Sequence, residues 1–95
     1  QLVFKKSVKS EKVGNIMEHS FGEDDSVTLI NDGKAALQFY LASTATTTAP
    51  TVMPLILFPN TQQTLTVNVL GDLNNKFLNV YNGEISDGHC TLEMI

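Results

Sequence analysis

The residues that could bind a transition metal or act as a nucleophile lie near the end of the chain. His89 and Cys90 are adjacent, and Met94 follows four positions after the cysteine. Blue-copper sites use His, Cys and Met, but there a histidine follows the cysteine, whereas here it precedes it. In a strand, His89 and Cys90 would point to opposite faces of the sheet and could share neither a metal nor a proton. We expect a buried structural thiol here.

A run of three acids is the best candidate for a metal site, and the metal would be calcium. Glu23, Asp24 and Asp25 follow Gly22, and Ca²⁺ takes about six to eight oxygen ligands, often several carboxylates of one loop. Further carboxylates could converge from neighbouring loops: Asp32, Asp72 and Asp87. The D-x-D-x-D-G spacing of the common calcium loop is absent, so a solvated acidic turn is the other interpretation.

Other catalytic arrangements are missing from the sequence. It contains no Ser/His/Asp order, no Gly-rich phosphate loop and no CxxC motif. Each acid falls beside an expected turn or at an outward strand position, whereas acid–base catalysis needs two such groups held together. The sequence therefore predicts a protein that is not an enzyme and that needs no cofactor, calcium excepted.

The charges argue against nucleic-acid binding. All six basic residues are lysines, and the net charge is −4. Arginine is the usual reader of phosphate and guanine, and an acidic body repels phosphate. The first twelve residues carry Lys5, Lys6, Lys9 and Lys12, and natural proteins often protect exposed sheet edges with lysine. We therefore expect an edge strand at the N-terminus.

The elements that would position these residues are strands. Apolar and polar residues alternate over residues 37–41, 64–69 and 90–94, which is typical of half-buried strands. In residues 37–41, Tyr40 would face outward. In residues 64–69, Leu65, Val67 and Val69 would face inward. Residues 26–30 and 76–81 are rich in β-branched or aromatic residues and predict two more strands, whereas residues 11–18 are consistent with a strand or a short helix.

Turn residues separate these segments at spacings typical of sandwiches and barrels. The turn pairs are Asp32-Gly33, Pro59-Asn60, Gly71-Asp72, Asn82-Gly83 and Asp87-Gly88. We predict that residues 1–95 form a single all-β domain, a two-sheet antiparallel sandwich of about seven to eight strands.

Two turn-and-strand segments resemble immunoglobulin-like modules of surface proteins. Asn31-Asp32-Gly33-Lys34 leads into one alternating strand, and Phe58-Pro59-Asn60-Thr61 leads into another; the modules carry similar turns, with glycine at the position of Asn60. The resemblance implies an immunoglobulin-like sandwich and a scaffold or adhesion role. It assigns a function to no particular residue.

An apolar run at residues 52–58 is the candidate partner-binding segment. It contributes Val52, Met53, Leu55, Ile56 and Phe58. A continuous apolar run is consistent with a core strand buried on both faces, but Pro54 removes one ladder hydrogen bond and favours an edge or a bulge. An edge strand beside the polar 43–51 connector would expose apolar surface, or unpaired main chain, to a partner.

The leading hypothesis is a non-catalytic structural or protein-interaction module that binds a protein partner, or forms a homo-oligomer, through loops or an edge strand. The alternative from another class is a calcium-dependent, lectin-like domain. A glycan could meet the asparagines expected near Tyr81, which are Asn74, Asn75, Asn79 and Asn82.

A third hypothesis is a membrane-active toxin component, although a membrane partner is disfavoured because the longest apolar run is too short for a span. The Thr-, Ser- and Asn-rich, arginine-free composition favours a secreted or cell-surface location.

Overall fold

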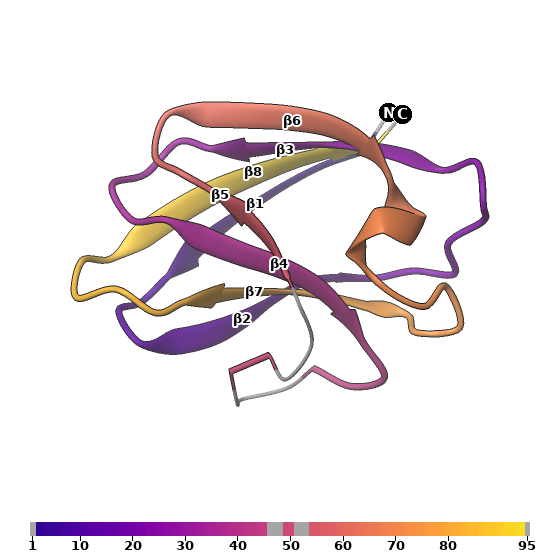
Figure 1. Ribbon diagram of the computed structural model, residues 1–95, viewed down its shortest axis with the longest axis horizontal. Helices are drawn as coiled ribbons and strands as arrows, with labels where there is room; N and C mark the ends of the chain where they lie inside the picture. The colour runs from indigo at the N-terminus through magenta and orange to yellow at the C-terminus, as the bar shows by residue number, and fades with distance from the viewer. Residues whose placement is uncertain (1, 46–48, 51–53, 95) are drawn as a thin grey trace.

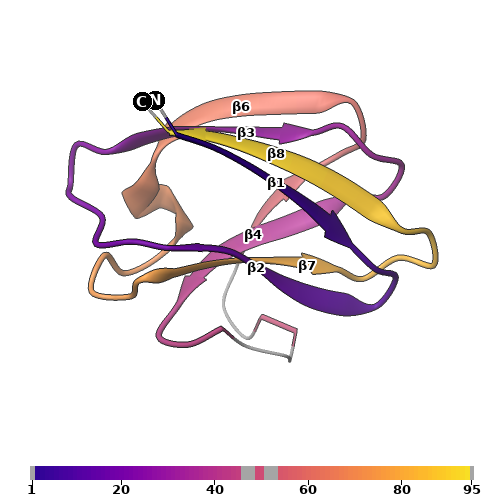
Figure 2. The same cartoon turned by 180° about the vertical axis from the view of Figure 1, so that it is seen from behind.

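The computed structural model describes residues 2–45, 49–50 and 54–94 and shows two stacked antiparallel sheets (Figures 1 and 2). The described strands are β1 (Leu2–Val8), β2 (Lys12–Glu18), β3 (Ser26–Asn31), β4 (Leu37–Ala42), β5 (Leu55–Leu57), β6 (Thr61–Thr66), β7 (Phe77–Asn82) and β8 (Gly88–Met94), and a short 3₁₀ helix, η1 (Val67–Leu70), follows β6. The predicted all-β sandwich is confirmed.

The order of strands defines the kind of sandwich. One sheet runs β1-β8-β3-β6 and the other β2-β7-β4-β5. The first strand thus pairs with the last, and successive strands from β1 to β4 alternate between the sheets, which is the arrangement of a jelly roll. In the immunoglobulin fold the first strand pairs with the second. The immunoglobulin resemblance therefore extends to the two-layer sandwich, and the strand order is that of a jelly roll.

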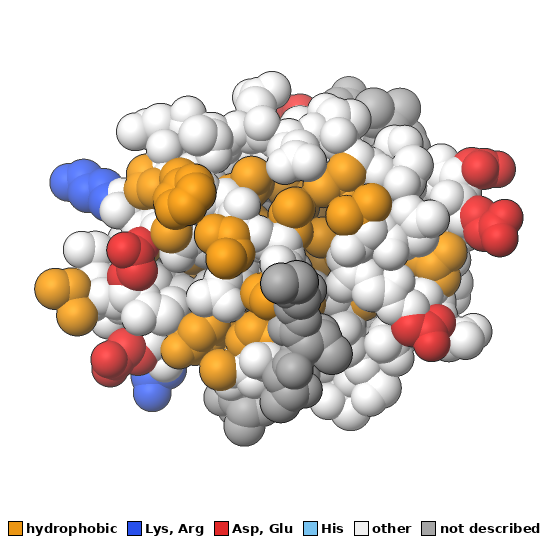
Figure 3. All heavy atoms as spheres, viewed as in Figure 1, with side chains coloured by type: hydrophobic (Ala, Val, Ile, Leu, Met, Phe, Trp, Pro, Cys, Tyr) orange, Lys and Arg blue, Asp and Glu red, His pale blue; other side chains and the backbone are white. Residues whose placement is uncertain are grey.

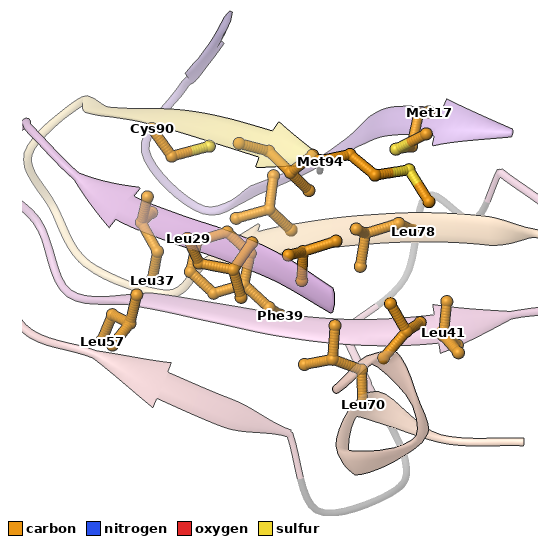
Figure 4. Close-up of a cluster of buried hydrophobic side chains, with 14 of the residues drawn as sticks. Met17, Leu29, Leu37, Phe39, Leu41, Leu57, Leu70, Leu78, Cys90 and Met94 are labelled. Carbon is orange, nitrogen blue, oxygen red and sulfur yellow. The ribbon is translucent and has the colours of Figure 1, made fainter. Parts of the chain in front are cut away.

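The core lies between the two sheets and is built from the inward positions of the strands (Figure 4). Phe39, Leu29, Leu37, Leu78 and Leu92 are fully buried there. Burying one such side chain stabilises the fold by about 1.5–3 kcal/mol. The predicted inward positions of β4 and β8 are confirmed, because alternation along a strand reports directly on which face is buried.

Cys90 is one of these core residues. It is a free thiol, 1% exposed. Burial, together with the negative charge of Asp32, raises its pKa to about 12. The thiol is therefore protonated at neutral pH and acts as a small apolar group. His89 is half-exposed on the opposite face of β8, as the strand prediction requires.

The predicted strand over residues 64–69 is wrong at both ends. β6 begins earlier, where Thr61 pairs with Asn31, and it ends at Thr66. The next four residues form η1, whose period of about three places Val67 and Leu70 on one buried side. Val69 is 58% exposed, so its predicted inward position is also wrong.

Tyr40 lies on the outer side of its sheet, as predicted, yet it is only 3% exposed. It stands opposite Asn79 on β7. The Nδ2 of Asn79 donates to the carbonyl oxygen of Thr44, 3.1 Å away, so the chain leaving β4 turns back over this face. Alternation identifies the face, but it does not show that a later segment covers it.

The described part of the N-terminal region forms two strands joined by a turn at Ser10 and Glu11. Residues 12–18, for which both strand and helix were open, form β2, and the pairing of β2 with β7 shifts register between Asn15 and Met17. β1 is the edge strand expected from its lysines, since it is the first strand of its sheet. No helix in the described ranges has the length and apolar character needed to cross a membrane.

Candidate functional site

The apolar run at residues 52–58 contributes the short edge strand β5. Val52 and Met53 lie outside the described residues. β5 is the last strand of its sheet and pairs with β4, so the predicted edge position is confirmed. Burial on both faces is wrong: Leu57 is buried and Leu55 is partly buried against the core, but Ile56 is 50% exposed. An edge strand three residues long has room for only one outward side chain here.

Phe58 follows β5 and is 66% exposed. The turn that carries it is well fixed: the hydroxyl of Thr61 donates to the Phe58 carbonyl at 2.6 Å, and the Asn60 amide donates to the Asn31 carbonyl at 2.8 Å. Asn60 has φ 62°, the left-handed region in which asparagine is tolerated better than most residues. Phe58 is therefore an exposed aromatic ring on an ordered turn.

The stretch of chain that contains these residues carries no charge. No Lys, Arg, His, Asp or Glu occurs between Lys34 and Asp72, so β4, β5, β6 and η1 are all uncharged. We call residues 55–71 the β5–β6 side. In Figure 3, which looks onto this side, apolar side chains gather over its centre and the charged groups appear around the rim. Exposed large apolar side chains on this side are Ile56, Phe58 and Val69.

A second cluster lies on the outer face of the β1-β8-β3-β6 sheet. The Nδ1 of His89 is 2.5 Å from Oδ1 of Asp32, and the hydroxyl of Thr91 donates to Oδ2 of the same carboxylate at 2.9 Å. Partial burial raises the pKa of Asp32, but the hydrogen bonds from His89 and Thr91 outweigh that effect, so its pKa lies below the ordinary 3.8.

Gly33 allows this contact, because a Cβ at that position would lie 2.4 Å from the His89 backbone nitrogen. Ser7 stands opposite His89 in the β1–β8 register, so Ser7, His89 and Asp32 follow one another across the sheet. The row lies on an outward face, with the His89 and Asp32 side chains 38% and 40% exposed. Electrostatic catalysis depends on excluding water, so we interpret the cluster as a tie between the loop after β3 and β8.

The acidic loop stands before β3. Glu23 and Asp24 are exposed, and the carboxylate of Asp25 accepts a hydrogen bond from the Gly22 amide at 2.7 Å. Asp32 and Asp87 lie at the other end of the sandwich, where Asp87 bonds Ser10. Among the described residues, no group of three or more His, Cys, Asp or Glu side chains is arranged to hold a metal ion. The calcium site remains a prediction.

Two of the asparagines proposed for glycan contact have structural roles. Asn79 is fully buried and bonds Asn15 and Thr44. Asn82 is also fully buried; its amide donates to the carbonyl oxygens of Val8 and Ser86 at 3.1 and 2.8 Å. Asn74, in the turn after η1, is exposed.

An open depression lies beside the start of β7 and is lined by Glu18, His19, Ser20 and Lys76. The His19 amide donates to the Lys76 carbonyl at 2.8 Å, and the His19 ring stacks at a tilt on Phe21 with centroids 5.1 Å apart. These contacts hold the loop after β2 against β7.

The strand order places the protein in the class of small jelly-roll sandwiches. No family model matches this sequence, and no curated protein matches it. Among solved structures, the crystal structure of PirA is similar, with a TM-score of 0.67 and 17% sequence identity over 100% of this chain and 94% of that chain. At this identity the similarity shows a common fold.

Sequence reasoning singled out Ile56 and Phe58, which are exposed in the structure, but it missed the Asp32–His89 pair and the extent of the uncharged side. The pair depends on the register between β3 and β8, which no local pattern reports. The uncharged stretch is visible in the sequence. It indicates one surface only once β5, β6 and η1 are known to share a side of the sandwich.

Proposed function

We propose that this chain is a non-catalytic protein-interaction module and that its contact surface is the β5–β6 side. The observation that carries the proposal is the exposure of Ile56, Phe58 and Val69, by 50%, 66% and 58%, within residues 55–71, a stretch that carries no charge. Single exposed apolar residues are ordinary on a protein surface. A group of them inside a charge-free region, bordered by charges, has the composition of an interface core and rim.

Phe58 should contribute the largest share of the binding free energy. Complete burial of a Phe or Ile side chain contributes about 1.5–3 kcal/mol, and a few buried anchors usually supply most of the binding energy of an interface. Phe58 is already held by its turn, and Ile56 by the pairing of β5 with β4. Ordered anchors lose little conformational entropy on binding. Leu55 and Leu57 would support these anchors from the core side.

The setting we propose is a secreted or cell-surface one, in line with the arginine-free composition. The similarity to PirA supports the sandwich as a scaffold and assigns no partner. The lectin-like and membrane-active alternatives differ from this proposal in what the protein contacts, so each has a direct test. Calcium is treated in the Discussion, and liposome co-sedimentation of the wild type tests the membrane.

Photo-crosslinking tests the proposal. A benzophenone amino acid replaces Phe58 in one variant and, as a matched control, Ile85 in another; Ile85 is 92% exposed but lies in the loop between β7 and β8. Each variant is irradiated alone and in an extract of its source.

We expect a discrete adduct at position 58, with a second copy or with another protein. Excess unlabelled wild type should compete for this adduct, and excess Phe58→Asp should not. Equal adducts at positions 58 and 85, or an adduct that wild type does not displace, would show that the β5–β6 side is not a specific contact surface.

A further inference from the structure

The four edge strands of the sandwich differ in how they are protected against pairing with another chain. An edge strand presents unpaired main-chain N–H and C=O groups, and proteins block them with lysine, bulges, proline or short strands. β1 carries Lys5 and Lys6, β2 has a register shift between Asn15 and Met17, and β5 is only three residues long and follows Pro54. Three of the four edges thus have a recognised protective feature.

β6 has none of these features. It is six residues long, Thr-Gln-Gln-Thr-Leu-Thr, and it pairs with β3 in continuous register from Asn31↔Thr61 to Ser26↔Thr66. It contains no charge, proline or glycine, and five of its residues are exposed and one is half-buried. Threonine and leucine suit an extended pairing strand. β6 is therefore the edge that is chemically prepared to accept another strand.

We propose that β6 pairs antiparallel with β6 of a second copy of this chain about a two-fold axis, so that two four-stranded sheets become one continuous sheet. This inference rests on the proposed function, because it names the partner of the β5–β6 side. A two-fold axis places each residue near its own copy. A charged edge would then repel itself, whereas an uncharged one can pair with itself.

The side chains of β6 suit such a register. If the axis passes beside Thr64, that residue faces its own copy and Gln62 faces Thr66 of the second copy, all on the outer face of the sheet. Thr–Thr and polar amide pairs across antiparallel strands are favourable. Thr64 already makes this kind of contact inside the chain, where its hydroxyl lies 2.8 Å from that of Thr28 on β3.

The face that contains β6 is comparable in size to a standard interface. The whole molecule measures 34 by 24 Å across the view that looks onto the β5–β6 side (Figures 1 and 3), and a standard interface buries roughly 800 Å² on each partner. The ladder supplies main-chain hydrogen bonds and orientation. Ile56, Phe58 and Val69 flank it and supply apolar area.

The test is the oligomeric state of the purified full chain, measured by sedimentation equilibrium from about 1 µM to 1 mM, the range of affinities in which a small interface shows a transition. The 10.4 kDa chain should sediment as a dimer at the upper end. Thr64→Lys, which sets two like charges opposite each other, should weaken association by about tenfold or more. Ser7→Lys adds the same charge to β1, on the far edge of the same sheet, and should leave association unchanged.

A charge exchange separates loss of pairing from loss of fold. Thr64→Lys and Thr64→Glu should each be monomeric, and an equimolar mixture of the two should recover the dimer. A wild type that stays monomeric at about 1 mM, the highest concentration of the experiment, would overturn self-pairing. The β5–β6 side would then remain free for another partner. A dimer that survives Thr64→Lys but not Phe58→Asp would overturn β6 as the contact and keep the proposed function. A dimer that survives both substitutions would overturn self-pairing through the β5–β6 side, and the crosslinking experiment would then decide the proposed function.

Discussion

The two long sides of this sandwich differ in the charges that their edge strands carry. On the side formed by β1 and β2 (Figure 2), lysines cover the strands and a register shift interrupts the ladder. Asn82 also joins the end of β1 to the loop before β8. The β5–β6 side has a comparable cross-link, since the buried Asn31 donates to the carbonyl oxygens of Ala35 and Leu57. Both sides expose apolar side chains, Leu2 and Val3 on β1 and Ile56, Phe58 and Val69 on the β5–β6 side (Figure 3). The difference is charge: lysines accompany the apolar residues of β1, whereas residues 55–71 carry none, and this difference fits our proposal that the β5–β6 side meets a partner.

The largest effect we expect is on the β1–β2 side. Asn82→Ala removes the donor to the Val8 and Ser86 carbonyls and the acceptor of the Glu84 amide. Buried groups left without a partner cost about 1–3 kcal/mol each, so the free energy of unfolding should fall by about 2–4 kcal/mol. Urea denaturation measures this. Asn74→Ala, in an exposed turn, is the control and should change stability by less than about 0.5 kcal/mol. Equal losses in the two variants would contradict the structural role of Asn82.

A smaller effect concerns Asp32, which ties the loop after β3 to β8. Asp32→Asn should destabilise the protein by about 1 kcal/mol at neutral pH, through weakened hydrogen bonds to His89 and Thr91. Because the folded-state pKa of Asp32 is lowered, its contribution is present above the unfolded pKa near 3.8. It is lost as the pH falls through the lower folded value.

The difference in stability between wild type and Asp32→Asn should therefore shrink as the pH falls below about 4. Thermal melts of both proteins across this range measure it. Comparing the two proteins cancels the titration of the other acids. A difference that does not shrink below about pH 4 would show that Asp32 is not stabilised in its charged form by these contacts.

On the β5–β6 side, mutation should affect binding rather than folding. Phe58→Asp replaces a side chain that is already 66% exposed, so the free energy of unfolding should change by less than about 0.5 kcal/mol. The same substitution should abolish competition in the crosslinking experiment. A loss of about 2 kcal/mol or more in urea denaturation would instead place Phe58 in the structural core, and the contrast between the two sides would disappear.

The fold was predictable from the sequence because buried and exposed residues alternate within each strand, so a few consecutive residues are enough to identify it. Alternation in residues 37–41 and 90–94 identifies β4 and β8, and Asp-Gly and Asn-Gly pairs mark turns beside them. The end of β6 was not predictable in this way. Val67 and Leu70 satisfy a period of three as well as Val67 and Val69 satisfy a period of two, and packing of η1 beside β4 decides between them.

The candidate site was predictable only in part, for a different reason. Ile56 and Phe58 belong to one apolar run, so the sequence shows them together. The Asp32–His89 contact joins residues far apart in the chain, and it depends on a neighbouring glycine, Gly33, that admits the β8 backbone. Exposure of β6 as an edge depends on the order of strands, which local patterns leave open.

The smallest effect we expect is that of calcium on the melting temperature. Calcium would bind the acidic loop before β3, which belongs to neither the β1–β2 side nor the β5–β6 side. The Asp25 carboxylate already bonds the Gly22 amide, while Glu23 and Asp24 extend into solvent. Millimolar calcium should therefore raise the melting temperature by less than about 1 °C, because only a ligand that binds the native state stabilises it. Asp24→Asn is the control and should melt identically with calcium or chelator. A rise of several degrees in wild type, absent in Asp24→Asn, would establish a calcium site and favour the lectin-like alternative over a module that binds through β5 and β6 alone.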